Sequence, residues 1–170
     1  MRDLLSAPML LLLVTLCGAQ AQGSSLLING DFESVKEDGW AYRGAQDASH
    51  GVFSEPTRPG TRSYMLQLNG SGEAGLSSIL QTAKVDTGKV YQLKLEIFDS
   101  CERVDSAIRD RVTIAVDGSM MFSHLLAEEK TKTGWLSFEA PFFALRPEAQ
   151  ISIVLEGSRL SREESTVLID

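Results

Sequence analysis

Residues 76–99, LSSILQTAKVDTGKVYQLKLEIFD, decide the fold. In the second half of this stretch, four core-type residues alternate with four others: Tyr91, Leu93, Leu95 and Ile97 against Gln92, Lys94, Glu96 and Phe98. This two-residue period predicts a strand with one face in a core and the other toward solvent or a ligand. The first half predicts a second strand, and Val85-Asp86-Thr87-Gly88 predicts the turn between them, because Gly88 can adopt a positive φ. We therefore expect a long hairpin, which needs further sheet to be stable.

The rest of the chain predicts that further sheet. We expect strands at residues 25–29, 40–43, 50–54, 63–69, 111–116, 120–123, 135–143, 149–156 and 165–169. Asn29-Gly30 and Asp117-Gly118 are turn dipeptides, the second of the type favoured in hairpins. Residues 124–132 are polar and predict an exposed loop or one helical turn. About ten short strands at even spacing, without a long amphipathic helix, predict an all-β fold of two antiparallel sheets packed face to face, a β-sandwich or jelly roll.

The first 21 residues have the features of a secretory signal peptide. Residues 9–16 are almost continuously apolar, and Ala19-Gln20-Ala21 is a small-x-small cleavage signal. We expect cleavage after Ala21, which leaves a single β-sandwich domain over residues 22–170 in an extracellular or periplasmic location. An uncleaved anchor and a lipoprotein modified at Cys17 are the alternatives, although the apolar run is short for a membrane span.

The net charge and the cysteine content limit the kinds of molecule that this protein is expected to bind. The net charge is −7, and an acidic surface disfavours nucleic acid and anionic lipid, whose phosphates need clustered Lys and Arg. After leader cleavage, Cys101 is the remaining cysteine, so we expect no internal disulfide, though a disulfide to a partner is open. Asn69-Gly70-Ser71 is a sequon, which makes Asn69 the predicted N-glycosylation site.

Three segments in order resemble galactose-binding-like jelly-roll domains, whose best-known members are secreted carbohydrate-binding modules. They are the opening LLINGDFE of residues 26–33 with Gly39-Trp40, the central Gln81-Thr82 followed by G-x-x-Y-x-L at residues 88–93, and the closing TVLID of residues 166–170. The resemblance covers about residues 25 to 170, nearly the whole expected mature chain, and it implies the same jelly-roll fold. In that family the last strand normally continues as Ile-Asp-Asp-Val, whereas this sequence stops at the first Asp. We therefore expect either a short last strand or a truncated sequence.

The resemblance also implies a structural calcium ion. In the family, the Glu of the opening motif and the first Asp of the closing motif approach each other, and these positions are Glu33 and Asp170 in this sequence. Calcium prefers six to eight oxygen ligands, so backbone carbonyls and water would have to complete the shell. The alternative is that both carboxylates are simply solvated.

The function that the resemblance implies is non-catalytic binding of a glycan or polysaccharide. A sugar presents an apolar C–H face and a ring of hydroxyls, so its site needs a flat aromatic beside fixed polar groups. The non-core face of the central strand offers such residues, and we expect the site to be built from Trp40, Tyr42, Gln92, Glu96, Phe98, Arg111 and Trp135. This face requires the strand of Arg111 to adjoin the central strand. Packing beneath a sheet edge is the alternative for Trp40 and Trp135.

Two other function classes remain open. A structural or adhesive module that binds an extracellular protein would show an apolar patch on a convex face or edge. A glycoside-processing enzyme would need a carboxylate pair, which the 23 acidic residues could contain. Catalysis has weak sequence support, because His50 and His124 lie in no metal or triad motif and no nucleophile motif surrounds Cys101. We therefore expect no catalytic residues.

Overall fold

The computed structural model describes residues 25–34, 36, 38–46, 48–54, 61–69, 75–99, 110–126, 135–157 and 165–170. The predicted signal peptide, Cys101 and the Gly70-Ser71 half of the sequon lie outside these residues, whereas Asn69 itself is exposed. Within the described residues there are ten strands and no helix, and hence no helix that could span a membrane. The strands are β1 (Ala41–Gly44), β2 (Ala48–Ser54), β3 (Arg62–Leu68), β4 (Leu76–Lys84), β5 (Val90–Asp99), β6 (Arg111–Val116), β7 (Ser119–Leu125), β8 (Trp135–Phe143), β9 (Glu148–Glu156) and β10 (Ser165–Ile169).

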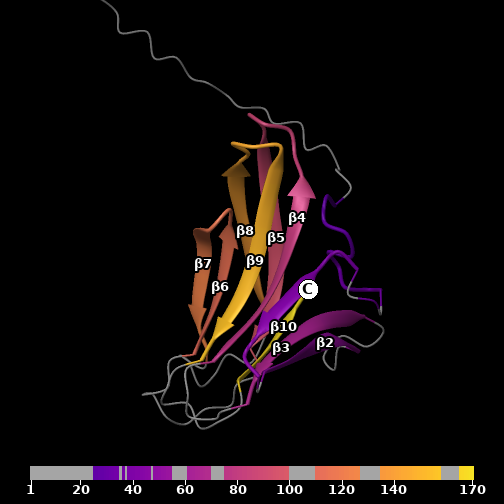
Figure 1. Cartoon of the computed structure of the whole chain (residues 1–170), viewed down its shortest axis with the longest axis vertical. Coiled ribbons are helices and arrows are strands. Elements are labelled where there is room, and N and C mark those ends of the chain that lie inside the picture. Colours follow the sequence, from indigo (N-terminus) through magenta and orange to yellow (C-terminus); the bar gives the residue numbers. More distant parts are fainter. Residues whose placement is uncertain are drawn as a thin grey trace, which may run out of the picture.

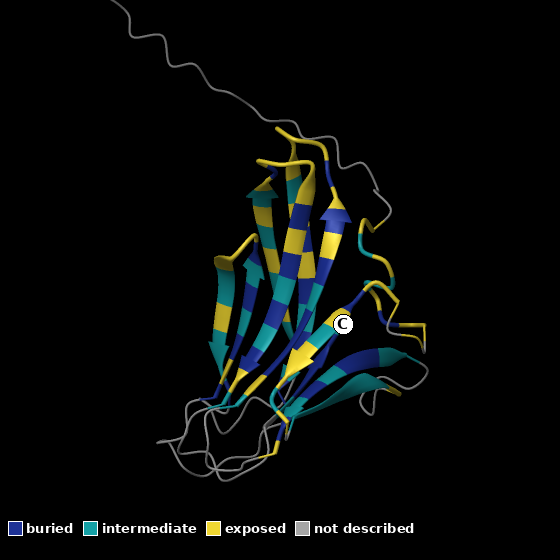
Figure 2. Ribbon diagram, in the orientation of Figure 1, coloured by how far each residue is buried: buried dark blue, intermediate teal, exposed yellow. Residues whose placement is uncertain are grey.

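The strands form two antiparallel sheets that pack face to face (Figure 1). Sheet A has the order β1-β4-β9-β6-β7, and sheet B has the order β2-β3-β10-β5-β8. Alternate residues of the central strands β5, β6 and β9 are buried between the sheets, which Figure 2 shows as bands along β9. The centre of the core is apolar and fully buried, with Leu66, Ile97 and Ile169 from sheet B facing Ile79 and Ile153 from sheet A. The predicted β-sandwich is confirmed.

The predicted central hairpin is wrong, although both of its strands and its turn are present. The backbone N–H of Lys89 donates to the carbonyl of Asp86 at 3.2 Å, and Gly88 has a φ of +82°. However, β4 pairs with β1 and β9 in sheet A, whereas β5 pairs with β10 and β8 in sheet B. A turn reverses the chain direction but does not fix which edges pair. Here the chain crosses from one sheet to the other, so that β4 and β5 bury their apolar faces against the same core from opposite sides.

Residues 25–29 do not form the predicted strand, because a side chain takes the place of a neighbouring strand. The buried Gln81 side chain accepts a hydrogen bond from the Ile28 N–H at 2.7 Å and donates one to the Ile28 carbonyl at 2.9 Å. The segment then turns at Asn29, where φ is +49°, as the Asn29-Gly30 dipeptide predicts. Gly39 is needed beside this contact: its φ is +85°, and a Cβ there would lie 2.8 Å from Gln81 Nε2.

The β6–β7 hairpin is longer than predicted. Its turn is the expected one, since Asp117 and Gly118 both have positive φ, +51° and +78°. The returning strand continues to Leu125, so His124 lies in a strand and not in the predicted loop. His124 pairs with the buried Val112 and therefore points toward the core, where Nε2 lies 3.4 Å from the Asp99 carboxylate. This buried partner explains why the polar His124 extends the strand.

We expect Gln81→Ala to lower the free energy of unfolding by about 2 kcal/mol, because two hydrogen bonds to Ile28 are lost and its backbone groups lose their partners. Thr82→Ala is the matched control. Thr82 is exposed on the same strand, so its loss should cost less than about 1 kcal/mol. Urea unfolding followed by tryptophan fluorescence measures both. Equal stabilities for the two variants would contradict this role of Gln81.

Candidate functional site

Within the described strands, aromatic side chains point outward on sheet B and not on sheet A. Residues that lie opposite each other in an antiparallel pair share a face, so the register assigns each residue to the core or the outside. The outer face of sheet A carries no aromatic residue along two cross-strand rows, which are small or aliphatic apart from Arg43: Ala41, Leu80, Ser152, Ala115 and Met120, and then Arg43, Ser78, Val154, Thr113 and Ser123. The outer face of sheet B carries Phe53, Phe98, Trp135 and Phe143. Sheet B is therefore the candidate binding face.

An apolar row crosses all five strands of sheet B at one level. Its members are paired neighbour to neighbour and are, in strand order, Gly51, Met65, Leu168, Phe98 and Trp135. The rings of Phe98 and Trp135 pack together with centroids 5.6 Å apart, tilted by 50°. Both are half-buried, as is Met65, whereas Leu168 is buried. With strands about 4.8 Å apart, the apolar row is about 19 Å long, which is enough for a short oligosaccharide.

Polar residues flank the apolar row on both sides. On one side lie Ser49, Gln67 and Thr166, with the Ser49 hydroxyl hydrogen-bonded to the Gln67 side chain. On the other side, Glu96 exchanges two backbone hydrogen bonds with Asp170, at 2.7 and 2.9 Å, and its carboxylate accepts one from Ser137 Oγ at 2.9 Å. Ser63 continues this side, and its Oγ is buried without a hydrogen-bond partner among the described residues. Hydroxyl, amide and carboxylate groups thus border an apolar strip.

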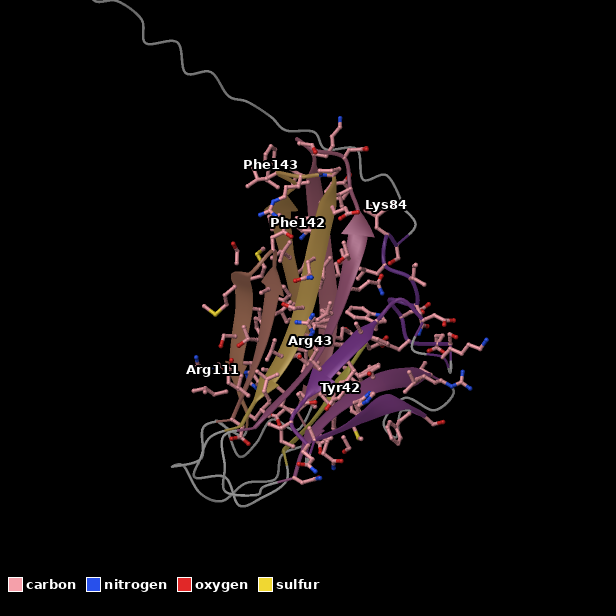
Figure 3. The ribbon with its side chains drawn as sticks, viewed as in Figure 1. Tyr42, Arg43, Lys84, Arg111, Phe142 and Phe143 are labelled. Carbon is pink, nitrogen blue, oxygen red and sulfur yellow. The ribbon has the colours of Figure 1, made fainter. Side chains whose placement is uncertain are left out.

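Four of the seven predicted ligand residues share one face, and three of them, Glu96, Phe98 and Trp135, lie close together, whereas Gln92 lies about 20 Å from Phe98 along β5. Gln92, Glu96, Phe98 and Trp135 all lie on the outer face of sheet B. Arg111 does not join them, because β6 belongs to sheet A and does not adjoin β5. The predicted shared groove between these two strands is therefore wrong, and Figure 3 shows Arg111 at the side edge of the molecule. The groove depended on these two strands adjoining, and alternation within a strand does not determine which strands pair.

Trp40 and Tyr42 lie in an aromatic cluster that closes the sandwich between β1 and β2. Trp40 is 8% exposed, packs on Phe32 at 5.3 Å between ring centroids, and donates its indole N–H to the Asn29 carbonyl. Tyr42 points inward and stacks on His50 at 3.5 Å. His50 Nδ1 in turn lies 2.7 Å from the hydroxyl of the buried Tyr64. Trp40 thus has the packing role that was its alternative interpretation, and neither residue is on the sheet B face.

Sequence reasoning missed most of the apolar row and one flank. Met65, Leu168, Gln67 and Thr166 were not predicted as site residues, although the alternation of residues 63–69 already put Met65 and Gln67 on one non-core face. Their pairing with β10 was the missing information. Strand order in a sheet comes from long-range contacts that a local period does not encode.

The predicted calcium ligands lie at the same end of the β3–β10 pair. The Glu33 carboxylate accepts a hydrogen bond from the Arg62 N–H at 3.1 Å, and Asp170 follows Ile169, the partner of Tyr64. The Arg62 guanidinium also donates to the Glu33 carbonyl at 2.7 Å, which places a positive charge beside the predicted site. The described residues contain no group of three or more His, Cys, Asp or Glu able to hold a metal. These contacts do not by themselves build a calcium shell, and the calcium ion stays a prediction of the resemblance.

A thermal melt decides the calcium prediction. If calcium joins Glu33 to Asp170, the melting temperature should be higher in millimolar calcium than in chelator, since binding at a hundredfold excess over Kd stabilises by about 2.7 kcal/mol. Glu33→Gln should abolish that difference. Coincident melts of the unmodified chain in calcium and chelator would contradict the site.

Comparisons with known proteins identify the fold. No family model matches the sequence, and no curated protein matches it. Among solved structures, TmCBM61 in complex with β-1,4-galactotriose superposes with a TM-score of 0.61 at 14% identity, over 87% of this chain and 95% of that one. The mannan-recognising carbohydrate-binding module TmCBM27 superposes with a TM-score of 0.50 at 14% identity, over 82% and 90%. The fold is the jelly roll of carbohydrate-binding modules.

The same fold also occurs in enzymes. A Stig cyclase from Fischerella sp. TAU superposes with a TM-score of 0.52 at 15% identity, over 85% of this chain and 92% of that one. At such identities the likeness shows the fold alone. The choice between binding and catalysis therefore depends on this chain's own residues.

Proposed function

We propose that this protein is a secreted, non-catalytic carbohydrate-binding module whose site is the outer face of sheet B. The observation that carries the proposal is the apolar row between two polar flanks, on the sheet that bears the outward aromatics of the described strands. Two of the solved neighbours with this fold are carbohydrate-binding modules, one bound to a galactotriose and one recognising mannan.

The arrangement suits a sugar chain that lies across the strands. The Phe98 and Trp135 rings offer an apolar surface against which the C–H face of a pyranose can pack. Glu96 and Asp170 accept hydrogen bonds from sugar hydroxyls, while the Gln67 amide can both donate and accept. Because the apolar row runs perpendicular to the strands, the sugar chain would extend from β8 toward β2. Successive sugar units would then meet the aromatic pair first and the Met65 region last.

The charges favour a neutral glycan. Both carboxylates of the site, Glu96 and Asp170, lie on one flank, and the chain as a whole carries a net charge of −7. A uronic acid or sulfated sugar would place like charges beside them, which is unfavourable. Hydroxyl groups of a neutral sugar instead donate to carboxylates, which makes stronger hydrogen bonds than neutral pairs.

Weak binding is expected, because a shallow face displaces water for a modest net gain. We expect Kd values on the order of 10 µM to 1 mM, equivalent to about −4 to −7 kcal/mol. Phe98→Ala and Trp135→Ala should each cost roughly 1–3 kcal/mol and abolish measurable binding, because each removes half of the stacking surface. A glycan array selects the ligand, and isothermal titration then measures each variant, with melts to verify folding because both rings are half-buried.

Arg111→Ala is the matched control for those variants. It removes a charged side chain from the exposed outer side of sheet A, so affinity for the selected glycan should be unchanged. Loss of binding in Arg111→Ala with full binding in Phe98→Ala would place the site on the other sheet. Cleavage of the selected glycan during incubation would show that the protein is an enzyme and would contradict the non-catalytic part of the proposal.

Secretion has its own test. We expect the mature protein to begin at Gln22, because the Ala19-Gln20-Ala21 signal directs cleavage after Ala21. N-terminal sequencing of exported protein measures this directly. A sequence starting at Met1 would contradict the cleaved leader, and a lipid-modified Cys17 would establish the lipoprotein alternative.

A further inference from the structure

Three exposed apolar side chains gather at one end of the molecule. Val90 and Phe143 are cross-strand partners where β5 begins and β8 ends, and they are 68% and 55% exposed. Leu145 follows in the β8–β9 connection and is 74% exposed. These three, called the apolar tip, are among eight large hydrophobic side chains that are exposed in the described residues. Figure 3 shows Phe143 at the upper end of the molecule, at the same end as Lys84.

The apolar tip is held by hydrogen bonds between two connections. The β4–β5 and β8–β9 connections both cross between the sheets at this end (Figure 1). Gly88 N–H donates to the Ala144 carbonyl at 2.8 Å, Ala144 N–H donates to the Lys89 carbonyl at 2.9 Å, and Val85 N–H donates to the Pro147 carbonyl at 3.0 Å. Beneath them Tyr91 stacks on Phe142 with ring centroids 5.7 Å apart. The exposed side chains therefore project from a fixed frame, so binding would cost little ordering entropy.

The charge around the apolar tip is opposite in sign to that of the chain. Lys89 precedes Val90 and Arg146 follows Leu145, and Lys84 lies at the same end. The acidic residues of these segments are Asp86 and Glu148. Three cations against two anions give this end a net charge of +1, whereas the whole chain carries −7.

We propose that the apolar tip inserts into an anionic lipid surface. Apolar side chains bordered by Lys and Arg are the pattern of peripheral membrane anchors, in which the apolar groups enter the headgroup boundary and the cations meet lipid phosphates. The tip lies at one end of the longest axis of the described fold, so it can reach a membrane while most of the acidic body stays beyond a Debye length of about 10 Å. The net charge of −7 would thus repel an anionic membrane from the body of the protein but not from the apolar tip.

The charge pattern also disfavours a second copy of the chain as the occupant. A symmetric tip-to-tip contact would bring Lys89 and Arg146 of one copy close to the same cations of the other. An anionic surface instead pairs with both. Contact through the apolar tip also leaves the proposed glycan site open, because Phe98 lies eight residues beyond Val90 on β5, which is about 26 Å along an extended strand. The exposed ion pair between Lys94 and Glu139, at 3.4 Å, lies between the two surfaces.

Vesicle sedimentation with the purified chain tests the proposal. The probes are vesicles of phosphatidylcholine alone and of equal parts phosphatidylcholine and phosphatidylglycerol. We expect binding to the anionic vesicles, about tenfold weaker binding to the neutral ones, and weakening as salt is raised. Phe143→Ser/Leu145→Ser and Lys89→Glu/Arg146→Glu should each lower the partition coefficient about tenfold. Met120→Ser is the matched control, since Met120 is 66% exposed on the β6–β7 hairpin and should leave partitioning unchanged.

A second measurement follows the tip itself. In Phe143→Trp, insertion should shift the added indole emission to shorter wavelength with anionic vesicles, after subtraction of the signal of the unmodified chain. Absence of binding to anionic vesicles, or equal binding by Met120→Ser and Phe143→Ser/Leu145→Ser, would overturn the proposal. So would sedimentation of the chain as a dimer that Phe143→Ser/Leu145→Ser dissociates, because the tip would then be a self-association surface. Glycan affinity should be the same in all tip variants, so failure here leaves the glycan-binding proposal separately testable.

Discussion

The structure depends on one constraint: β4 and β5 follow each other in the chain but must lie in different sheets. Each has an apolar face too long to be buried by a two-stranded ribbon, and packing both faces against a common core buries them fully. The β8–β9 connection makes the same crossing beside it, and hydrogen bonds from Gly88 and Val85 join the two. Because both connections pass from one sheet to the other, β4 and β5 pair with other strands, most of them distant in sequence. The double crossing also presents the ends of both connections at one pole of the molecule.

For the first described segment, a buried side chain takes the place of a pairing strand. The Gln81 amide satisfies both backbone groups of Ile28, which a neighbouring strand would otherwise do. Burying an amide is favourable only when its hydrogen bonds are made, so this contact fixes the position of the segment closely. Gly39 keeps the space beside it open. The aromatic residues that follow, Phe32 and Trp40, are thereby drawn into the core and away from any binding surface.

The outer face of sheet B carries the residues of the proposed glycan site. The proposed glycan site draws on strands that are mostly distant in sequence, since the apolar row joins β2, β3, β10, β5 and β8, of which only β2 and β3 are consecutive in the chain. The aromatic pair comes from neighbouring strands β5 and β8, and the half-buried Met65 continues the row beyond the buried Leu168. The apolar tip belongs to the same two strands but lies beyond the end of β10, where the sheet has narrowed. One strand pair therefore carries both proposed surfaces, separated by polar residues.

The sequence by itself determined the all-β class, all ten described strands to within a few residues, and the turns at Asn29 and Asp117, although it also predicted a strand at residues 25–29 that does not form. Strands and turns depend on the alternation of apolar and polar residues and on backbone dihedral preferences, and both are local properties of the sequence. It also determined that Phe98 and Glu96 face away from the core, because alternation along one strand assigns its two sides. Only the tertiary structure decided which strands share a sheet, because pairing is a competition among distant segments for the same edge hydrogen bonds and the same core. For that reason Arg111 lies apart from the predicted site, and Met65 lies in the row of the proposed one.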